Sequence, residues 1–331
     1  MRARWSAYRA VIAVAVIGIS LVGCSSTGGK PAATGGGNSA GTADTPRIKI
    51  AMVTHAQVGD TFWDTVRKGA EMAAAKDNVE LTYQGAEQAP EQANAIQSAI
   101  DSKVDGIAVT LAKPDAMEPA VAAAAKAGIP VIAFNAGFDA WKTQDVLGYI
   151  GTDEQASGRA VGERLNSEGA KNVVCVNHAQ GHVDLEARCA GIAQTFKGRS
   201  EILYVNGNDM PAAQATMTAK LQQDPSIDYL VTLDAPFAMT AFNTASSAGS
   251  KAKVGTFGTD NEVTKSIQAN GVQWAIDIQP YLQGYLAVDS LWLYLTNRNV
   301  IGGGQPVLTG PAFIDAKNVA SIAEYAAKGT R

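Results

Sequence analysis

The sequence predicts an α/β protein with two lobes, each built on a parallel sheet covered by helices. Short runs rich in valine and isoleucine alternate with longer alanine-rich segments from residue 47 onward. The runs are apolar along nearly their whole length, which is typical of strands buried on both faces. At least nine runs occur, more than we expect in a single open sheet of a chain this size.

The predicted elements follow one another regularly along the chain. The strands are expected at residues 48–54, 79–83, 106–110, 130–135, 173–177, 201–205, 228–233, 253–257 and 272–278. The helices are expected at residues 62–77, 91–103, 115–127, 154–166, 212–224 and 281–295. Pro114, Pro211 and Pro280 stand at or just before helix starts, where a missing N–H costs no hydrogen bond. The alternation breaks at residues 147–153, which we interpret as a crossing between the lobes.

The N-terminus is typical of an export signal. Three arginines precede an uncharged apolar run at residues 11–22, which is of signal-peptide length and too short to span a bilayer. The run ends in Leu-Val-Gly-Cys at residues 21–24, which resembles a bacterial lipobox. We therefore expect a lipoprotein signal at residues 1–23 and lipidation at Cys24, on the extracytoplasmic face of the cell membrane. The alternative is an ordinary secretory signal with an incidental cysteine.

Composition narrows the remaining chain further. Residues 24–46 are rich in glycine, serine and threonine, which predicts a flexible linker. Without residues 1–23 the chain has 24 basic and 31 acidic residues, a net charge of −7 that argues against nucleic-acid binding. Cys175 and Cys189 could form a disulfide in an oxidising compartment, or could be two small buried hydrophobic residues.

Polar or aromatic residues follow nearly every predicted strand. Ligands of open α/β sheets bind outside the carboxyl ends of the strands, so we expect these residues to line a site. Asp and Asn oxygens accept hydrogen bonds from hydroxyls, Arg donates them, and aromatic rings cover C–H faces, which predicts a polyhydroxylated ligand. The candidates are His55, Asp60, Phe62, Trp63, Asn135, Arg188, Asn208, Asp234, Asp260 and Gln279.

Most of these residues also have a purely structural interpretation. The alternatives are core packing for one of the two aromatics, a satisfied core histidine at His55, a turn at Asn135, an ion pair with Glu186 at Arg188, and helix capping at Asp234 and Asp260.

Signatures of catalysis are hard to find. The sequence contains no G-x-S-x-G motif and no phosphate-binding G-x-x-x-x-G-K-[ST] loop. His178 and His182 are four residues apart, but the glycine between them indicates a loop and not a metal-binding helix face. We therefore expect no enzyme, no cofactor and no metal.

Taken together, the motifs resemble the periplasmic substrate-binding proteins of ABC importers, in the ribose- and galactose-binding branch. The resemblance extends over nearly all of residues 48–295, through stretches such as IAMVTH (50–55), DTFWDTVRKGAE (60–71), YIGTDEQASGRAVGERL (149–165), HVDLEARCAGI (182–192), VTLDAPFAMTAF (231–242) and AIDIQPYLQGYLAV (275–288).

The resemblance implies a type I periplasmic binding protein fold, in which two Rossmann-like lobes are joined by three hinge strands. The lobes would comprise residues 47–151 with 280–307, and residues 152–279 with 308–331. Crossings would lie near Thr152, Gln279 and Leu308. The family's ligand positions fall on His55, Asp60, Phe62, Trp63, Asn135, Arg188, Asn208 and Asp234.

The chain departs from the family pattern at two positions. Gly258 follows Phe257 where the family often has Asp, and Ile278 stands where it often has Gln. Both changes remove groups that grip an aldose ring, so an acyclic polyol or a modified sugar is expected as readily as ribose or galactose.

The expected function is that of a monomeric lipoprotein that captures a small sugar or polyol between closing lobes and delivers it to an ABC permease. The alternative is a receptor that presents its ligand to a membrane kinase or chemoreceptor. A repressor is disfavoured, because a signal and linker stand where a DNA-binding headpiece would be. A secreted enzyme would need a nucleophile or metal site that the sequence does not reveal.

Overall fold

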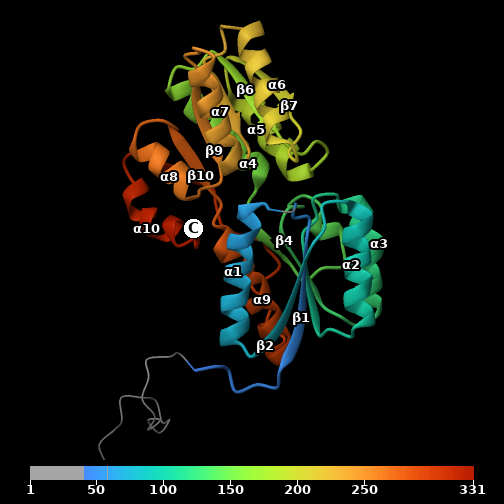
Figure 1. Cartoon of the computed structure of the whole chain (residues 1–331). Helices are drawn as coiled ribbons and strands as arrows, with labels where there is room; N and C mark the ends of the chain where they lie inside the picture. Colours follow the sequence, from blue (N-terminus) through green and yellow to red (C-terminus); the bar gives the residue numbers. More distant parts are fainter. Residues whose placement is uncertain (1–40, 58) are drawn as a thin grey trace, which may run out of the picture. The chain divides into compact units, whose positions relative to one another are not determined.

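Two six-stranded sheets organise the chain (Figure 1). The structure is a computed structural model that describes residues 41–57 and 59–331. The first sheet runs in the order β11 (Val307–Leu308), β5 (Tyr149–Gly151), β4 (Val131–Asn135), β3 (Gly106–Val109), β1 (Ile48–Thr54) and β2 (Val79–Gly85). The second runs in the order β12 (Ala312–Asp315), β10 (Trp274–Asp277), β9 (Lys253–Phe257), β8 (Tyr229–Thr232), β6 (Asn172–Asn177) and β7 (Arg199–Tyr204).

All neighbouring strands are parallel except β10 and β12, which are antiparallel. The predicted α/β fold with two parallel sheets is therefore confirmed. The inner strands of both sheets are buried on both faces, as their continuous apolar runs predict, whereas the edge strands β2 and β7 are mostly half-buried or exposed.

Helices cover each face of both sheets. The first sheet is covered on one face by α1 (Thr61–Lys76) and α9 (Pro280–Asn297), and on the other by α2 (Ala89–Asp101) and α3 (Pro114–Lys126). The second is covered by α4 (Glu154–Ser167) and α5 (Val183–Thr195) on one face, and by α6 (Met210–Gln223), α7 (Ala235–Ser247) and α8 (Asn261–Gln268) on the other. A short helix, α10 (Ala323–Ala327), contacts α8. Each lobe thus has two apolar cores separated by its sheet.

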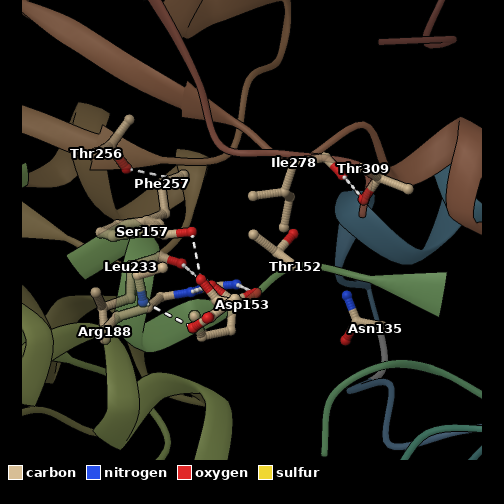
Figure 2. Close-up of polar contacts among 12 residues, drawn as sticks. Asn135, Thr152, Asp153, Ser157, Arg188, Leu233, Thr256, Phe257, Ile278 and Thr309 are labelled. Atoms are coloured by element: carbon tan, nitrogen blue, oxygen red, sulfur yellow. Dashed lines mark hydrogen bonds and ion pairs between the residues drawn. The ribbon is translucent and has the colours of Figure 1, made fainter. Parts of the chain in front are cut away.

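The chain passes between the two sheets after β5, after β10, and between β11 and β12. The fully buried side chain of Gln283 joins two of these passages: its Nε2 donates to the Ile278 carbonyl at 2.8 Å and to the Thr309 hydroxyl at 3.0 Å. Thr309 in turn donates to the same carbonyl at 2.8 Å (Figure 2). The lobe boundaries given above stay a prediction.

Residues 41–331 form one compact unit. Among its described residues, no helix combines the length and the apolar character needed to cross a bilayer. The predicted signal, most of the linker and Cys24 lie outside the described residues. Cys175 of β6 and Cys189 of α5 are joined by a disulfide, so the structure favours the bridge over two free buried thiols.

Candidate functional site

A cavity of about 50 Å³ lies at the carboxyl ends of strands from both sheets. His55 follows β1, Asn135 ends β4, and Asp234 follows β8 by two residues. The cavity brings together seven predicted site residues, namely His55, Asp60, Phe62, Trp63, Asn135, Arg188 and Asp234. They meet because parallel strands deliver their carboxyl ends to one edge of a sheet. That they contact a ligand stays a prediction.

The other three predicted residues do not line this cavity. Asn208 is exposed and donates to Glu87 Oε1 at 2.9 Å. Asp260 caps α8 by accepting from the Val263 backbone N–H at 2.7 Å, which is the structural alternative considered for it. Gln279 has a left-handed backbone with φ 57°, and its Nε2 donates to the Thr309 carbonyl at 2.6 Å.

Arg188 is held inside the protein by Glu154. Two guanidinium nitrogens of Arg188 donate to the two Glu154 carboxylate oxygens at 2.7 and 2.9 Å. A third nitrogen donates to the Leu233 carbonyl at 3.0 Å (Figure 2). Both side chains of this ion pair are at least 95% buried. The alternative partner, Glu186, instead accepts from Gly181 and Tyr204, so Arg188 is not part of a surface pair with it.

The carboxyl groups of Asp60 and Asp234 reach the cavity from different lobes. Burial raises the pKa of Asp60 to about 6, although its Oδ1 accepts from the Phe62 N–H at 2.9 Å. Burial, helped by the charge of Asp60, raises the pKa of Asp234 well above its ordinary value. Gly258 also lines the cavity, and a Cβ built there would lie 3.3 Å from Asp234 Oδ1. The glycine therefore leaves room beside this carboxylate.

Aromatic rings and histidines form the less polar wall. Trp63 is 6% exposed, and its ring meets those of Phe62 and His55 edge-on, with centroids 5.1 and 4.8 Å apart. It packs into the core and also lines the cavity, so the two interpretations of this aromatic pair do not exclude each other. Phe62 is partly buried against the same core.

Two histidines in the wall were not predicted as site residues. His178 stacks on Phe237 with ring centroids 4.5 Å apart, and His182 meets His55 edge-on at 5.2 Å. Burial lowers the pKa of His55 and of His178 to about 3, so both rings are neutral at physiological pH. His178 follows β6 directly, so the strand-end rule was sufficient to find it.

One His/Asp group among the described residues has a spacing that suggests a metal. A ring nitrogen of His55, one of His182 and a carboxylate oxygen of Asp184 all lie within 4.8 Å of one another. Thr110 Oγ1 lies 2.7 Å from His55 Nδ1, so only the other ring nitrogen of His55 is left for a further partner. Neutral polar groups and carboxylates around a small cavity suit a compact solute with several hydroxyls.

Comparison with known protein families identifies the family of this chain. The model of the periplasmic binding protein domain matches residues 50–299 of this chain. The chain belongs to this family. As a member, it is an extracytoplasmic binding protein and not an enzyme.

The binding protein is similar to several characterised relatives. A carbohydrate transporter from Acidothermus cellulolyticus, solved in complex with myo-inositol, is 55% identical, covers 86% of this chain and all of its own, and superposes with a TM-score of 0.86. The xylose/arabinose-binding protein of Sulfolobus acidocaldarius is 25% identical over 83% of this chain and 72% of its own length. A xylitol-binding protein of Mycolicibacterium smegmatis is 28% identical over 56% of this chain and 50% of its own length.

Proposed function

We propose that this binding protein captures a neutral polyol, with myo-inositol as the leading candidate, and delivers it to an ABC permease. It is the solute-binding component of a sugar ABC transporter. The observation that carries the choice of ligand is the charge of the cavity. Asp60, Asp184 and Asp234 line it, and the guanidinium of Arg188, the permanent cation among its described lining residues, is already paired with Glu154.

This arrangement favours hydroxyls over anions. Carboxylates accept hydrogen bonds from several hydroxyls, whereas a phosphate or uronate brought beside them would meet like charge. A polyol that bonds to Asp60 of one lobe and Asp234 of the other contributes free energy only when both lobes surround it, so its binding favours closure.

The relatives support a polyol independently. The protein that is 55% identical binds myo-inositol, and a more distant relative is a xylitol-binding protein. Gly258 and Ile278 leave two positions without the polar side chains that would grip an aldose ring.

The lipobox supports the further proposal of a lipid anchor at Cys24. Such an anchor would keep the binding protein at the membrane surface near its permease. Mass spectrometry of the mature N-terminus tests this proposal: a diacylated cysteine as the first residue is expected, and an unmodified Cys24 would contradict it.

A thermal-shift titration tests the ligand. Myo-inositol, xylitol, D-xylose, D-ribose and glucuronate are compared as ligands. At about 100 times its dissociation constant the true ligand should add about 2.7 kcal/mol to the free energy of unfolding. We expect this from myo-inositol, and not from the anion. No shift with any sugar or polyol would overturn the proposal.

Two matched aspartates provide the control for this experiment. Asp234 and Asp260 both occupy the N-cap position of a helix, but only Asp234 lines the cavity. Asp234→Asn should abolish the shift and Asp260→Asn should retain it, because Asn caps helices about as well as Asp. The reverse result would show that the ligand does not occupy this cavity.

A further inference from the structure

A buried chain of hydrogen bonds lies behind His55. Gln92 comes from α2, Thr110 follows β3, and their side chains do not line the cavity. The exposed fractions of Gln92, Thr110 and His55 are 2, 0 and 9%. Buried polar groups of this kind must satisfy one another, so the direction of each hydrogen bond can be worked out.

The amide of Gln92 has only one consistent orientation. Its Nε2 lies 2.9 Å from the Thr110 backbone carbonyl, which can only accept, so this atom must be the NH₂ group. Nε2 also lies 3.1 Å from Thr110 Oγ1 and donates its second hydrogen there. The backbone N–H of His55 donates to the same hydroxyl oxygen at 3.0 Å.

These two bonds determine which ring nitrogen of His55 carries the proton. A hydroxyl oxygen has two lone pairs, and Gln92 and the His55 backbone occupy both. The hydroxyl hydrogen is therefore donated, and His55 Nδ1 lies 2.7 Å away. A neutral imidazole that accepts at Nδ1 carries its proton at Nε2. Burial keeps the ring neutral, because it lowers the pKa of His55 to about 3.

We propose that Gln92 and Thr110 fix His55 as a hydrogen-bond donor towards the cavity, so that the site selects a solute with an oxygen acceptor at that position. Gln92 and Thr110 are thus positioning residues, and His55 determines specificity. The inference rests on the proposed function, because it assumes that the solute occupies this cavity.

Asp184 supplies the complementary acceptor. One of its carboxylate oxygens lies within 4.8 Å of a ring nitrogen of His55. Its Oδ1 is buried without a hydrogen-bond partner among the described residues. A single solute hydroxyl would accept from His55 and donate to Asp184, which satisfies both groups. An ammonium group has no lone pair for His55, so an amino-substituted polyol is disfavoured at this position.

Thr110→Val tests the inference, because it keeps the shape of the side chain and removes both the donor and the acceptor. The affinity for myo-inositol is measured by calorimetry, and the protonated ring nitrogen of His55 by ¹⁵N NMR, with His55→Gln to assign its signals. We expect roughly 10- to 100-fold weaker binding and loss of the pure Nε2–H form. Thr110→Ser should restore both.

Thr54→Val is the matched control. Thr54 is also fully buried, precedes His55 directly, and its hydroxyl bonds to Tyr83 and not to the histidine. This variant should retain the affinity and the tautomer. If Thr110→Val does not fold, Gln92→Leu serves instead, since it frees one lone pair of Thr110 and should allow the Nδ1–H form to appear.

An Nδ1–H form in the wild-type protein would overturn the inference, as would unchanged affinity in a folded Thr110→Val. If the wild-type protein binds no polyol, the proposed function fails, while the NMR measurement still decides whether Gln92 and Thr110 set the tautomer.

Discussion

Single residues set the charge balance of this site, and Asp60 does so most directly. Its carboxyl group is pushed towards the neutral form by burial, with a pKa of about 6, and its charge in turn raises the pKa of Asp234. Without ligand, the cavity therefore holds carboxylates that are costly to ionise together. Solute hydroxyls would replace the hydration that these groups lost.

Asp60→Asn should change how stability depends on pH. As pH falls through about 6, the native protein takes up a proton that the unfolded chain takes up only near pH 3.8, so the cost of the buried charge is relieved. Without ligand, Asp60→Asn should exceed wild type in free energy of unfolding by about 1–3 kcal/mol at pH 7.5. The gap should close near pH 4 in urea-unfolding measurements.

The buried histidines act in the opposite direction, because their lowered pKa values reduce stability as pH falls below about 6.5. The histidines are present in both the wild type and Asp60→Asn, so the difference in free energy of unfolding between the two proteins reports on Asp60 alone. Glu118→Gln changes an exposed carboxylate on α3, away from Asp60, and serves as the control. A gap for Asp60→Asn that stays constant with pH would contradict the assignment of a raised pKa.

At the scale of elements, α4 and α5 hold one wall of the cavity. They cross so closely that a Cβ on Gly158 would lie 2.2 Å from the Arg188 carbonyl. This approach places Glu154 of α4 against Arg188 of α5. The disulfide joins α5 to β6, the strand that leads to His178, with a Cα–Cα distance of 5.8 Å. Helix pair and disulfide therefore position the wall together.

Removing the disulfide should destabilise the protein. The bridge closes a short loop, since its cysteines are 14 positions apart. By limiting the conformations of the unfolded chain, such a bridge typically raises the free energy of unfolding by about 2–4 kcal/mol. Cys175→Ala with Cys189→Ala should lose about this free energy in denaturant unfolding. Wild-type protein with the bridge reduced should behave like the variant, and an unchanged midpoint in both would argue that the bridge carries no stability.

At the scale of the whole molecule, hydrogen bonds join the lobes beside the cavity. The Val183 N–H donates to the Ala112 carbonyl at 3.1 Å, and Asn208 Nδ2 donates to Glu87 at 2.9 Å. Elsewhere, Arg331 Nε donates to the fully buried carboxylate of Asp277 at 2.8 Å. Asn208, predicted to bind ligand, thus contributes to the contact between lobes.

Breaking the bond between Glu87 and Asn208 should weaken ligand binding. Glu87 also accepts from the Nε2 of Gln57, which lines the cavity, at 3.3 Å. The side chains of Glu87 and Asn208 are accessible to solvent, so we expect only about a two- to fivefold loss of affinity in Glu87→Ala, measured by calorimetry. Asn208→Ala leaves the contact between Gln57 and Glu87 in place, so it should cost no more than Glu87→Ala, and the double variant should cost no more than Glu87→Ala alone. Additive losses would contradict the coupling, and Glu91→Ala in the first turn of α2 is the control.

The pattern of apolar runs was sufficient to predict most elements. The predicted strands at 48–54 and 253–257 coincide with β1 and β9, because both are apolar segments with clear ends. The pattern could not reveal β11 and β12, which are two and four residues long and pair only because distant segments meet.

The strand-end rule predicted seven residues of the cavity and failed where local geometry intervened. Asn208 follows β7, the edge strand of its sheet, and lies too far to the side. A left-handed backbone redirects Gln279, and capping of α8 occupies Asp260. His182 and Asp184 were not predicted, because nothing in the sequence indicates that the start of α5 faces the cavity.

The sequence by itself determined that this protein has two parallel sheets, because continuous apolar runs are stable only when both faces are covered. It also predicted that polar and aromatic residues gather at the strand ends, and seven of the predicted residues line one cavity there. Only the tertiary structure decided which charged side chains of the cavity are already paired with another residue. Glu154 neutralises Arg188, and Gln92 with Thr110 orients His55, through contacts between residues that are 18 to 55 positions apart in the chain. Such pairings depend on how the elements pack, and no local pattern records them.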